Sequence, residues 1–373
     1  MLKKKNVVLM YISEVSGHHS ATLAIEKALH TLSSNIETLN INAFRYTNPI
    51  SEKVVNQIYT TVIKRTPMIW DLIYDNPTVK ERLEKIKDAI HKMNSKKFQR
   101  LFGKFHPDAV ICTQAFPCGM VADYKKMYNA HFPLIAVLTD YVPHSYWIYD
   151  NVDFYVVPSE EIGHRLMLKG VPPEKIKPLG IPFDFKFNAP VDRHKVYASL
   201  GLDPRVPTML LMGGGQGLGP IKSIVKALEK VEMDFQEIIV CGVNKKLYSS
   251  LQKKIKKYGK KIVLLKYVDN INELMTISQL IVTKPGGITT SEALSKKLPM
   301  LIIKPIPGQE ASNTVYLTEK NAAIKIDHPR HIDLVVQDLF EHPHKISQLS
   351  ECAGALSKPN ASMDIAKLIL EVA

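Results

Sequence analysis

Residues 280–294 read LIVTKPGGITTSEAL, and their pattern indicates the class of fold. A short apolar run typical of a buried strand leads into a glycine turn, and a helical pattern follows directly. Strand, turn and helix in this order form the repeating half of a parallel sheet with crossover helices. The order also brings the first amides of a helix to the end of a strand, where an anion is favoured. The stretch therefore predicts an open parallel sheet with a ligand site at its edge.

The same alternation extends in both directions along the chain. We expect strands, separated by helical patterns, at residues 7–11, 38–41, 109–113, 134–138, 154–157, 209–212, 237–241, 262–265, 280–283 and 300–303. Two such series predict an α/β fold of two Rossmann-like, doubly wound domains. Open sheets of this type bind ligands beyond the carboxyl ends of their strands, so we expect the two domains to face a cleft.

Prolines mark the expected boundary between the domains. Seven of them lie between residues 172 and 207, where they disfavour both helix and strand. We therefore expect an N-terminal domain at residues 1–185, a linker at 186–206 and a C-terminal domain at 207–373. The last helix is free to pack back on the first domain. A length of 373 residues suits two domains of this size.

The composition is that of a folded protein with an anionic partner. Hydrophobic residues make up 45% and charged residues 23% of the chain, and the formal net charge is +13. No apolar run approaches the roughly 20 residues of a membrane-spanning helix, and the basic start leads into a strand, so we expect a cytoplasmic protein. The four cysteines lack the spacing of a zinc site, which predicts reduced thiols and no metal. Charge alone leaves nucleic acid, a membrane surface and a phosphorylated substrate open.

Two glycine-rich loops follow strands of the second half. The first, GGGQGLGP at residues 213–220, serves either phosphate binding or close packing of the backbone. The second, KPGG at residues 284–287, precedes a helix whose first amides suit a diphosphate. We assign the following residues of these loops to donor binding: Gly214, Gly215, Gly286, Gly287, Ile288 and Thr289.

Three polar side chains near these loops are candidates for recognising a sugar nucleotide. Glu292 lies early in the helix after residues 284–287, where a carboxylate either accepts two ribose hydroxyls or caps the helix. The loop KPIPGQEASN at residues 304–313 follows the next strand and presents Gln309 and Glu310. Amide and carboxylate groups together supply the donors and acceptors that sugar hydroxyls require.

A histidine marks the end of the first strand. His18 follows Gly17 in the sequence SGHHSA at residues 16–21, at a junction between strand and helix. A histidine in this place acts as a base near neutral pH or donates a hydrogen bond. Asp140 ends another strand of the same domain and is the alternative base, although helix capping is an equally common use of such a residue.

With these loops in this order, the chain resembles the family of monogalactosyldiacylglycerol synthases and processive diacylglycerol glucosyltransferases. The resemblance runs nearly end to end and is strongest over TKPGGITTSEAL and PIPGQEASN. It extends to SGHHSA and to TDYVPHSYW at residues 139–147, which contains His144. The resemblance implies a GT-B fold, inversion at the anomeric carbon and a reaction without a metal or other cofactor.

The resemblance also implies roles for the site residues. Glu292 binds the ribose, Gln309 and Glu310 bind the donor sugar, and the glycines at 286–287 bind the diphosphate. His18 takes the position of the family's histidine after the first strand, close to the acceptor. Gly17 and His144 are assigned to the acceptor side.

The acceptor side carries an apolar segment followed by a basic one. Residues 53–74 are rich in aromatic and aliphatic side chains that include Trp70, and residues 80–104 carry nine Lys or Arg against three acids. Apolar anchors beside a basic face favour docking to anionic lipid. The residues expected to contact headgroups are Lys92, Lys96, Lys97 and Arg100. Nucleic acid is disfavoured as a partner because no stacking aromatics alternate with the basic residues.

We therefore expect an inverting glycosyltransferase that moves a hexose from a UDP-sugar to a lipid, most simply diacylglycerol, at the cytoplasmic face of a membrane. Two other functions fit the same residues: a nonhydrolysing UDP-sugar epimerase, and a non-enzymatic UDP-sugar sensor that binds a protein. The identity of the sugar and of the lipid, the processivity and the oligomeric state stay open.

Overall fold

The computed structural model of this chain describes residues 4–14, 16–47, 96–142 and 147–373. Three of the predicted site residues, Trp70, Lys92 and His144, lie outside the described residues. The chain divides into two compact units. The first comprises Met1–Phe185, Ile306–Gln309 and Asn360–Ala373, and the second comprises Lys186–Pro305 and Glu310–Pro359.

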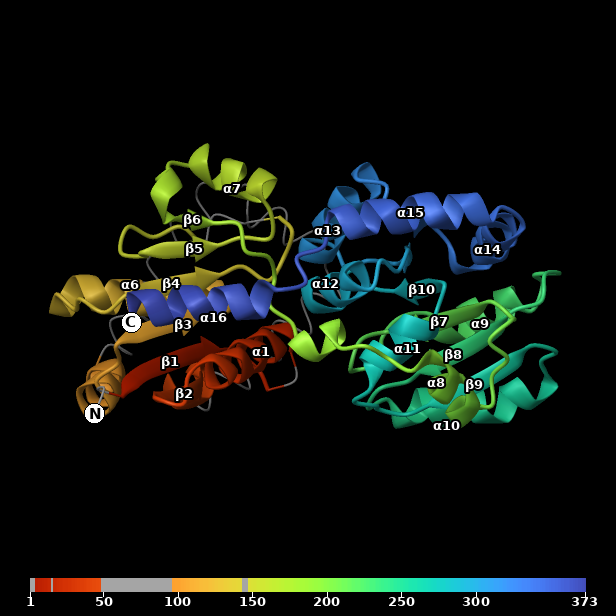
Figure 1. The fold of residues 1–373 in the computed structure, drawn as a ribbon, viewed down its shortest axis with the longest axis horizontal. Helices are drawn as coiled ribbons and strands as arrows, with labels where there is room; N and C mark the ends of the chain where they lie inside the picture. Colours follow the sequence, from red (N-terminus) through yellow and green to blue (C-terminus); the bar gives the residue numbers. More distant parts are fainter. Residues whose placement is uncertain (1–3, 15, 48–95, 143–146) are drawn as a thin grey trace. The chain divides into compact units, whose positions relative to one another are not determined.

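The first unit is built on a six-stranded sheet (Figure 1). Its strands are β1 (Lys5–Tyr11), β2 (Ile36–Asn42), β3 (Ala109–Cys112), β4 (Leu134–Val137), β5 (Phe154–Val156) and β6 (Ile176–Lys177). They pair in parallel in the order β2-β1-β3-β4-β5-β6. Every residue of β3 and β4 is buried, which explains why these strands are continuous apolar runs rather than alternating ones.

Helices connect these strands. They are α1 (Gly17–Leu32), α2 (Ala43–Thr47), residues 96–105, α6 (Ala115–Tyr128), α7 (Glu160–Met167) and the 3-10 turn η2 (Pro173–Lys175). The N-cap of α1 is Ser16, whose hydroxyl accepts a hydrogen bond from the amide of His19 at 3.2 Å. The helix buries Ala21, Ile25 and Leu29, which recur every four residues on one face.

The last helix, α16 (Ala361–Val372), packs against α1 in the first unit (Figure 1). Ile365, Ala366 and Ile369 are fully buried in one hydrophobic cluster with residues of β1 and α1. Ser362 donates a hydrogen bond to the carbonyl of Phe183. The core of the first unit therefore combines residues from the two ends of the chain.

The second unit repeats the architecture with another six-stranded parallel sheet (Figure 1). Its strands are β7 (Thr208–Met212), β8 (Gln236–Val240), β9 (Lys261–Leu265), β10 (Leu280–Thr283), β11 (Met300–Ile303) and β12 (Ala323–Ile326). Their order is β12-β11-β10-β7-β8-β9. Two doubly wound parallel sheets confirm the predicted fold class.

The helices of the second unit follow its strands. They are α8 (Arg193–Leu200), α9 (Ile221–Leu228), α10 (Lys245–Lys254), α11 (Ile271–Ile277), α12 (Gly287–Ser295), α13 (Gln309–Glu319), α14 (Ile332–Glu341) and α15 (Pro343–Ala355), with the 3-10 turns η3 (Phe185–Asn188), η4 (Ile255–Lys257) and η5 (Pro329–His331). The expected linker, residues 186–206, contains α8, which contacts α11. The buried hydroxyl of Tyr197 donates to the carbonyl of Ile277 at 2.7 Å, so this segment is folded into the second unit.

Each sheet has one point at which the direction of its strand order reverses. In the first sheet β2 lies on one side of β1, whereas β3 and the strands that follow it lie on the other side. In the second sheet β7 leads to β8 and β9, whereas β10 leads to β11 and β12. Such switch points leave a crevice at the carboxyl ends of the strands, where ligands of doubly wound sheets bind.

Candidate active site

The switch point of the first sheet carries His18. This residue is the second of α1, directly beyond β1, and its half-buried ring reaches the end of the neighbouring strand β3. Nδ1 of His18 lies 2.9 Å from the carbonyl oxygen of Thr113 and 2.9 Å from Oγ1 of Thr139. A carbonyl oxygen only accepts, so Nδ1 must carry the hydrogen. The neutral ring consequently has its lone pair on Nε2.

The protonation state of His18 suits a base. Burial lowers the pKa of His18 to about 4, and the hydrogen bond to the carbonyl of Thr113 opposes this shift. The ring is therefore neutral at pH 7 and able to take a proton. A base with a lowered pKa needs stabilisation of its charged form, which the oxygens around Nδ1 supply.

The adjacent His19 is engaged in a different contact. Its ring stacks on Tyr11 with centroids 4.3 Å apart, and its Nδ1 lies 2.8 Å from the carbonyl oxygen of Glu14. The carboxylate of Glu14 also accepts a hydrogen bond from the hydroxyl of Tyr11 at 2.8 Å. His19 thus stabilises the loop after β1. Its neighbour His18 instead points its ring toward the ends of β3 and β4.

Asp140 and Gly17 lie at the same edge of the first sheet. Asp140 is half-buried, follows Thr139 and lies three residues beyond the end of β4. Gly17 is exposed as the first residue of α1. The structure thus brings His18 and the threonines of the β3 and β4 loops together, with Asp140 next along the chain.

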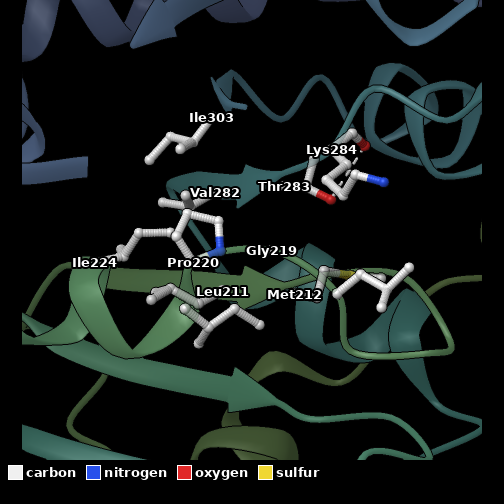
Figure 2. A pocket seen from close by; sticks show the side chains of 11 residues that line it. Leu211, Met212, Gly219, Pro220, Ile224, Val282, Thr283, Lys284 and Ile303 are labelled. Atoms are coloured by element: carbon white, nitrogen blue, oxygen red, sulfur yellow. Dashed lines mark hydrogen bonds between the residues drawn. The ribbon is translucent and has the colours of Figure 1, made fainter. Parts of the chain in front are cut away.

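The switch point of the second sheet forms a crevice between the ends of β7 and β10. Its volume is about 270 Å³, including space open to solvent. Figure 2 shows aliphatic side chains at one end of the crevice and Thr283 and Lys284 at the other. The lining residues are Leu211, Met212, Leu218, Gly219, Pro220, Ile221, Ile224, Val282, Thr283, Lys284 and Ile303.

The helix after β10 begins without a side-chain cap. Gly286 is the N-cap of α12. Because glycine has no side chain, this cap residue forms no hydrogen bond to the first amides of the helix. These amides belong to Gly287, Ile288 and Thr289, and the helix dipole adds partial positive charge at the same end. Glu292 is half-buried in the second turn of α12. The arrangement leaves a strand end, a glycine turn and helix amides available to an anion.

The loops after β10 and β11 are joined by two contacts. Nζ of Lys284 lies 2.7 Å from Oε1 of Glu310, and the two side chains are 14% and 20% exposed. The fully buried Asn313 donates its amide hydrogen to the carbonyl of Pro285 at 3.0 Å. Gln309 is half-buried as the first residue of α13. Two motifs predicted to bind one donor are therefore neighbours in the structure.

The glycine loop after β7 is packed against the loop after β8. Gly242 has a φ of +57°, and a Cβ added there would lie 2.2 Å from the carbonyl oxygen of Gly215. The side chain of Asn244 donates to the carbonyl of Gly217 at 3.1 Å. The positions of added Cβ atoms at Gly214 and Gly215 are open, so the backbone is accessible there. The loop serves close packing and also exposes part of its backbone.

Three of the four basic residues that we expect to contact lipid headgroups lie within the described residues. Lys96, Lys97 and Arg100 are exposed on the helix of residues 96–105, whereas Phe98 and Phe102 on the same helix are buried. The ammonium of Lys97 contacts the carbonyl of Thr47. The apolar face anchors the helix and leaves its charged face outside.

Two further observations concern the described chain as a whole. None of its helices combines the length and the hydrophobicity that a membrane crossing requires. Within the same residues, no group of three or more His, Cys, Asp or Glu side chains is arranged to hold a metal ion.

Sequence reasoning missed several of the contacting residues. Thr113, Thr139 and Lys284 had no assigned role, although Thr139 and Lys284 lie within the quoted motifs. A position directly after a strand of a parallel sheet was the available signal, since such positions meet at one edge.

Two family models match the chain. Residues 18–183 match Monogalactosyldiacylglycerol (MGDG) synthase, and residues 208–369 match the Glycosyltransferase family 28 C-terminal domain. A processive diacylglycerol beta-glucosyltransferase of Bacillus licheniformis is 29% identical over 373 residues, covering 100% of this chain and 96% of the relative.

Solved structures share the fold. MurG of Acinetobacter baumannii has a TM-score of 0.66 at 14% identity, covering 98% of this chain and 99% of the other. The UDP-GlcNAc 2-epimerase of Neisseria meningitidis, bound to UDP-GlcNAc, has a TM-score of 0.60 at 13% identity and covers 98% of this chain and 100% of the other. At these identities the similarity concerns the fold alone.

Proposed function

The chain belongs to the glycosyltransferases that join a monogalactosyldiacylglycerol synthase domain to a family 28 C-terminal domain. We propose that it transfers a hexose from a UDP-sugar to a lipid acceptor. Diacylglycerol is the proposed acceptor, as the name of the Bacillus licheniformis relative suggests. The observation that carries the proposal is His18, a neutral imidazole with its lone pair on Nε2, at the switch point of the first sheet.

In this proposal the C-terminal domain, residues 207–373, binds the donor. The amides at the start of α12, next to Gly286 and including that of Gly287, donate hydrogen bonds to the diphosphate, and Glu292 accepts hydrogen bonds from the ribose hydroxyls. Gln309 and Glu310 bind the sugar. The ion pair between Lys284 and Glu310 supports this assignment, because it fixes a carboxylate beside the helix start that would hold the diphosphate. Gly214 and Gly215 add accessible backbone at the neighbouring strand end.

The N-terminal domain, residues 1–185, would supply the acceptor side and the base. A hydroxyl oxygen of the acceptor attacks the anomeric carbon from the face opposite the diphosphate, and its proton moves to Nε2 of His18. The new C–O bond forms as the bond to the diphosphate breaks, which inverts the anomeric centre. The electron pair leaves with UDP, whose added charge the α12 amides stabilise. Asp140 is the alternative base.

A lipid acceptor requires the enzyme to work at a membrane surface, and we place it at the cytoplasmic face. Lys96 and Arg100 are exposed on a helix whose other face is anchored, which suits contact with anionic headgroups. Their joint replacement by Gln should reduce pelleting with anionic vesicles at 0.1 M salt. The matched change of Lys222 and Lys226, exposed lysines of α9, should have little effect. Equal pelleting of both variants with neutral and anionic vesicles would reject this surface.

The test of the function is a panel of radiolabelled UDP-sugars incubated with lipid vesicles that contain diacylglycerol. We expect labelled glycolipid, whereas an epimerase would yield a new UDP-sugar without lipid and a sensor would yield neither. His18→Ala should bind UDP normally and lose roughly 100-fold or more in turnover. Glu292→Ala should weaken UDP and UDP-sugar alike by about 1.5 to 3 kcal/mol, measured by calorimetry. Near-normal turnover of His18→Ala would shift the role of base to Asp140.

A further inference from the structure

Three buried threonine hydroxyls surround His18. Thr22 and Thr113 both donate to the main-chain carbonyl of His18, at 3.0 and 2.9 Å. Their own hydroxyl oxygens lie 3.0 Å apart. Thr139 instead approaches the ring, with Oγ1 at 2.9 Å from Nδ1. All three side chains are at most 5% exposed, so water does not compete freely for these bonds.

The two kinds of contact restrain different degrees of freedom. The bonds from Thr22 and Thr113 fix the main chain of His18 but leave rotation about its side-chain torsions possible. The carbonyl of Thr113 binds Nδ1–H from the end of β3, and the hydroxyl oxygen of Thr139 binds the same hydrogen from the loop after β4. Two acceptors on different strands define the plane of the ring, which a single acceptor does not.

We propose that Thr139 is a positioning residue for His18: as the second acceptor of Nδ1–H it holds the ring so that Nε2 faces the acceptor hydroxyl. This inference rests on the proposed function of His18 as the base. When Nε2 takes a proton, the ring becomes positive and both oxygens at Nδ1 bind it more strongly. Thr139 therefore acts on orientation and on basicity through the same hydrogen bond.

Three titratable residues are sequence neighbours of His18, Thr113 and Thr139. His19 follows His18 on α1 and is engaged with Tyr11 and Glu14. Cys112 precedes Thr113, and burial raises the pKa of its thiol well above the usual value, so it stays neutral. Asp140 follows Thr139, and its charge could also affect His18. Its replacement must accompany the test.

The experiment compares Thr139→Val, which keeps the shape of the side chain without the hydroxyl, with Thr139→Ser, which keeps the hydroxyl. Thr139→Val should lower kcat about tenfold or more with little change in KM for the UDP-sugar. The acid limb of its kcat/KM profile should move to lower pH, because loss of an acceptor weakens the protonated form of His18. Thr139→Ser should restore both values. The matched control, Thr22→Val, removes a neighbouring buried hydroxyl that does not touch the ring, so its acid limb should not move.

Nitrogen-15 NMR of the His18 ring provides a readout that does not depend on activity. The whole protein should show the Nδ1–H tautomer and one set of ring signals. Thr139→Val should keep this tautomer, because the carbonyl of Thr113 still accepts from Nδ1–H, but it should show more than one ring orientation, in an Asp140→Asn background as well. Normal turnover by His18→Ala would refute the proposed base while leaving the NMR result intact. Wild-type ring signals and a wild-type pH profile in folded Thr139→Val would refute the positioning role itself.

Discussion

The ion pair between Lys284 and Glu310 joins the two loops of the donor region, and its removal has a calculable effect. We consider Lys284→Met, Glu310→Gln and the double variant. The two side chains are 14% and 20% exposed, with Nζ and Oε1 2.7 Å apart. Exposed pairs contribute about 0 to 1 kcal/mol, whereas loss of one partner of a buried pair costs about 3 to 5 kcal/mol.

The pair lies between these limits, so we expect each single variant to lose about 2 kcal/mol of unfolding free energy. The coupling energy of the double-mutant cycle should be about 1 to 2 kcal/mol. Lys345 and Asp338 form the matched control, because their N–O distance is also 2.7 Å but the side chains are 41% and 47% exposed. The coupling energy of that pair should be about 0.5 kcal/mol or less.

Urea unfolding of the two cycles measures both coupling energies. Activity provides the second readout: Lys284→Met should raise KM for the UDP-sugar more than it weakens UDP, since Glu310 loses the partner that orients it toward the sugar. Equal coupling energies in the two pairs would refute the argument from burial. A wild-type KM in Lys284→Met would refute the positioning of Glu310.

Two further predictions concern stability. Burial, reinforced by Glu229 and opposed by Lys260, raises the pKa of Glu237 to about 8, so the folded chain keeps a proton that the unfolded chain releases above about pH 4.5. The wild type therefore loses unfolding free energy at this group as the pH rises. In urea unfolding, the free energy of unfolding of Glu237→Gln relative to that of the wild type should increase by about 3 kcal/mol between pH 5 and pH 8. A difference that does not change with pH would show that Glu237 is ionised in the folded protein. Gly242→Ala should lower the free energy of unfolding by more than about 2 kcal/mol, because Gly242 has a positive φ and an added Cβ would lie 2.2 Å from the carbonyl oxygen of Gly215. The control, Gly259→Ala, has open space around its Cβ position and should lose under about 1 kcal/mol. Similar losses in both variants would contradict the packing of the two loops.

Most of the strands that the sequence predicts are buried on both faces. All of the strands expected from apolar runs are present, because a parallel sheet covered by helices selects such runs. The two strands that were not expected, β6 and β12, lie at sheet edges. β6 has two residues in a proline-rich segment, and β12 is partly exposed. The other two edge strands, β2 and β9, were expected, because they have seven and five residues. Position at an edge therefore does not hide a strand by itself, whereas the short length of β6 and the lysine within β12 weaken the apolar pattern.

Within the candidate site, sequence identified the residues with distinctive chemistry and missed those that hold them. His18 follows a glycine at a strand end, which is a local pattern. Its partners Thr113 and Thr139 are 95 and 121 residues away, and threonine is common in strands. Lys284 resembles any loop lysine until the fold brings Glu310 beside it. Contacts of this kind depend on strand order, which periodicity does not encode.

The position of α16 has a consequence for the order in which the protein forms. Ribosomes make a chain from its N-terminus, and an N-terminal domain ordinarily folds first. Here the cluster around β1 and α1 includes Ile365, Ala366 and Ile369, which follow the whole second unit along the chain. The hydrophobic core of the first unit can therefore be completed only after the second unit has been synthesised. Until then the apolar surface that α16 covers is exposed on the nascent chain, where we expect chaperones to bind it.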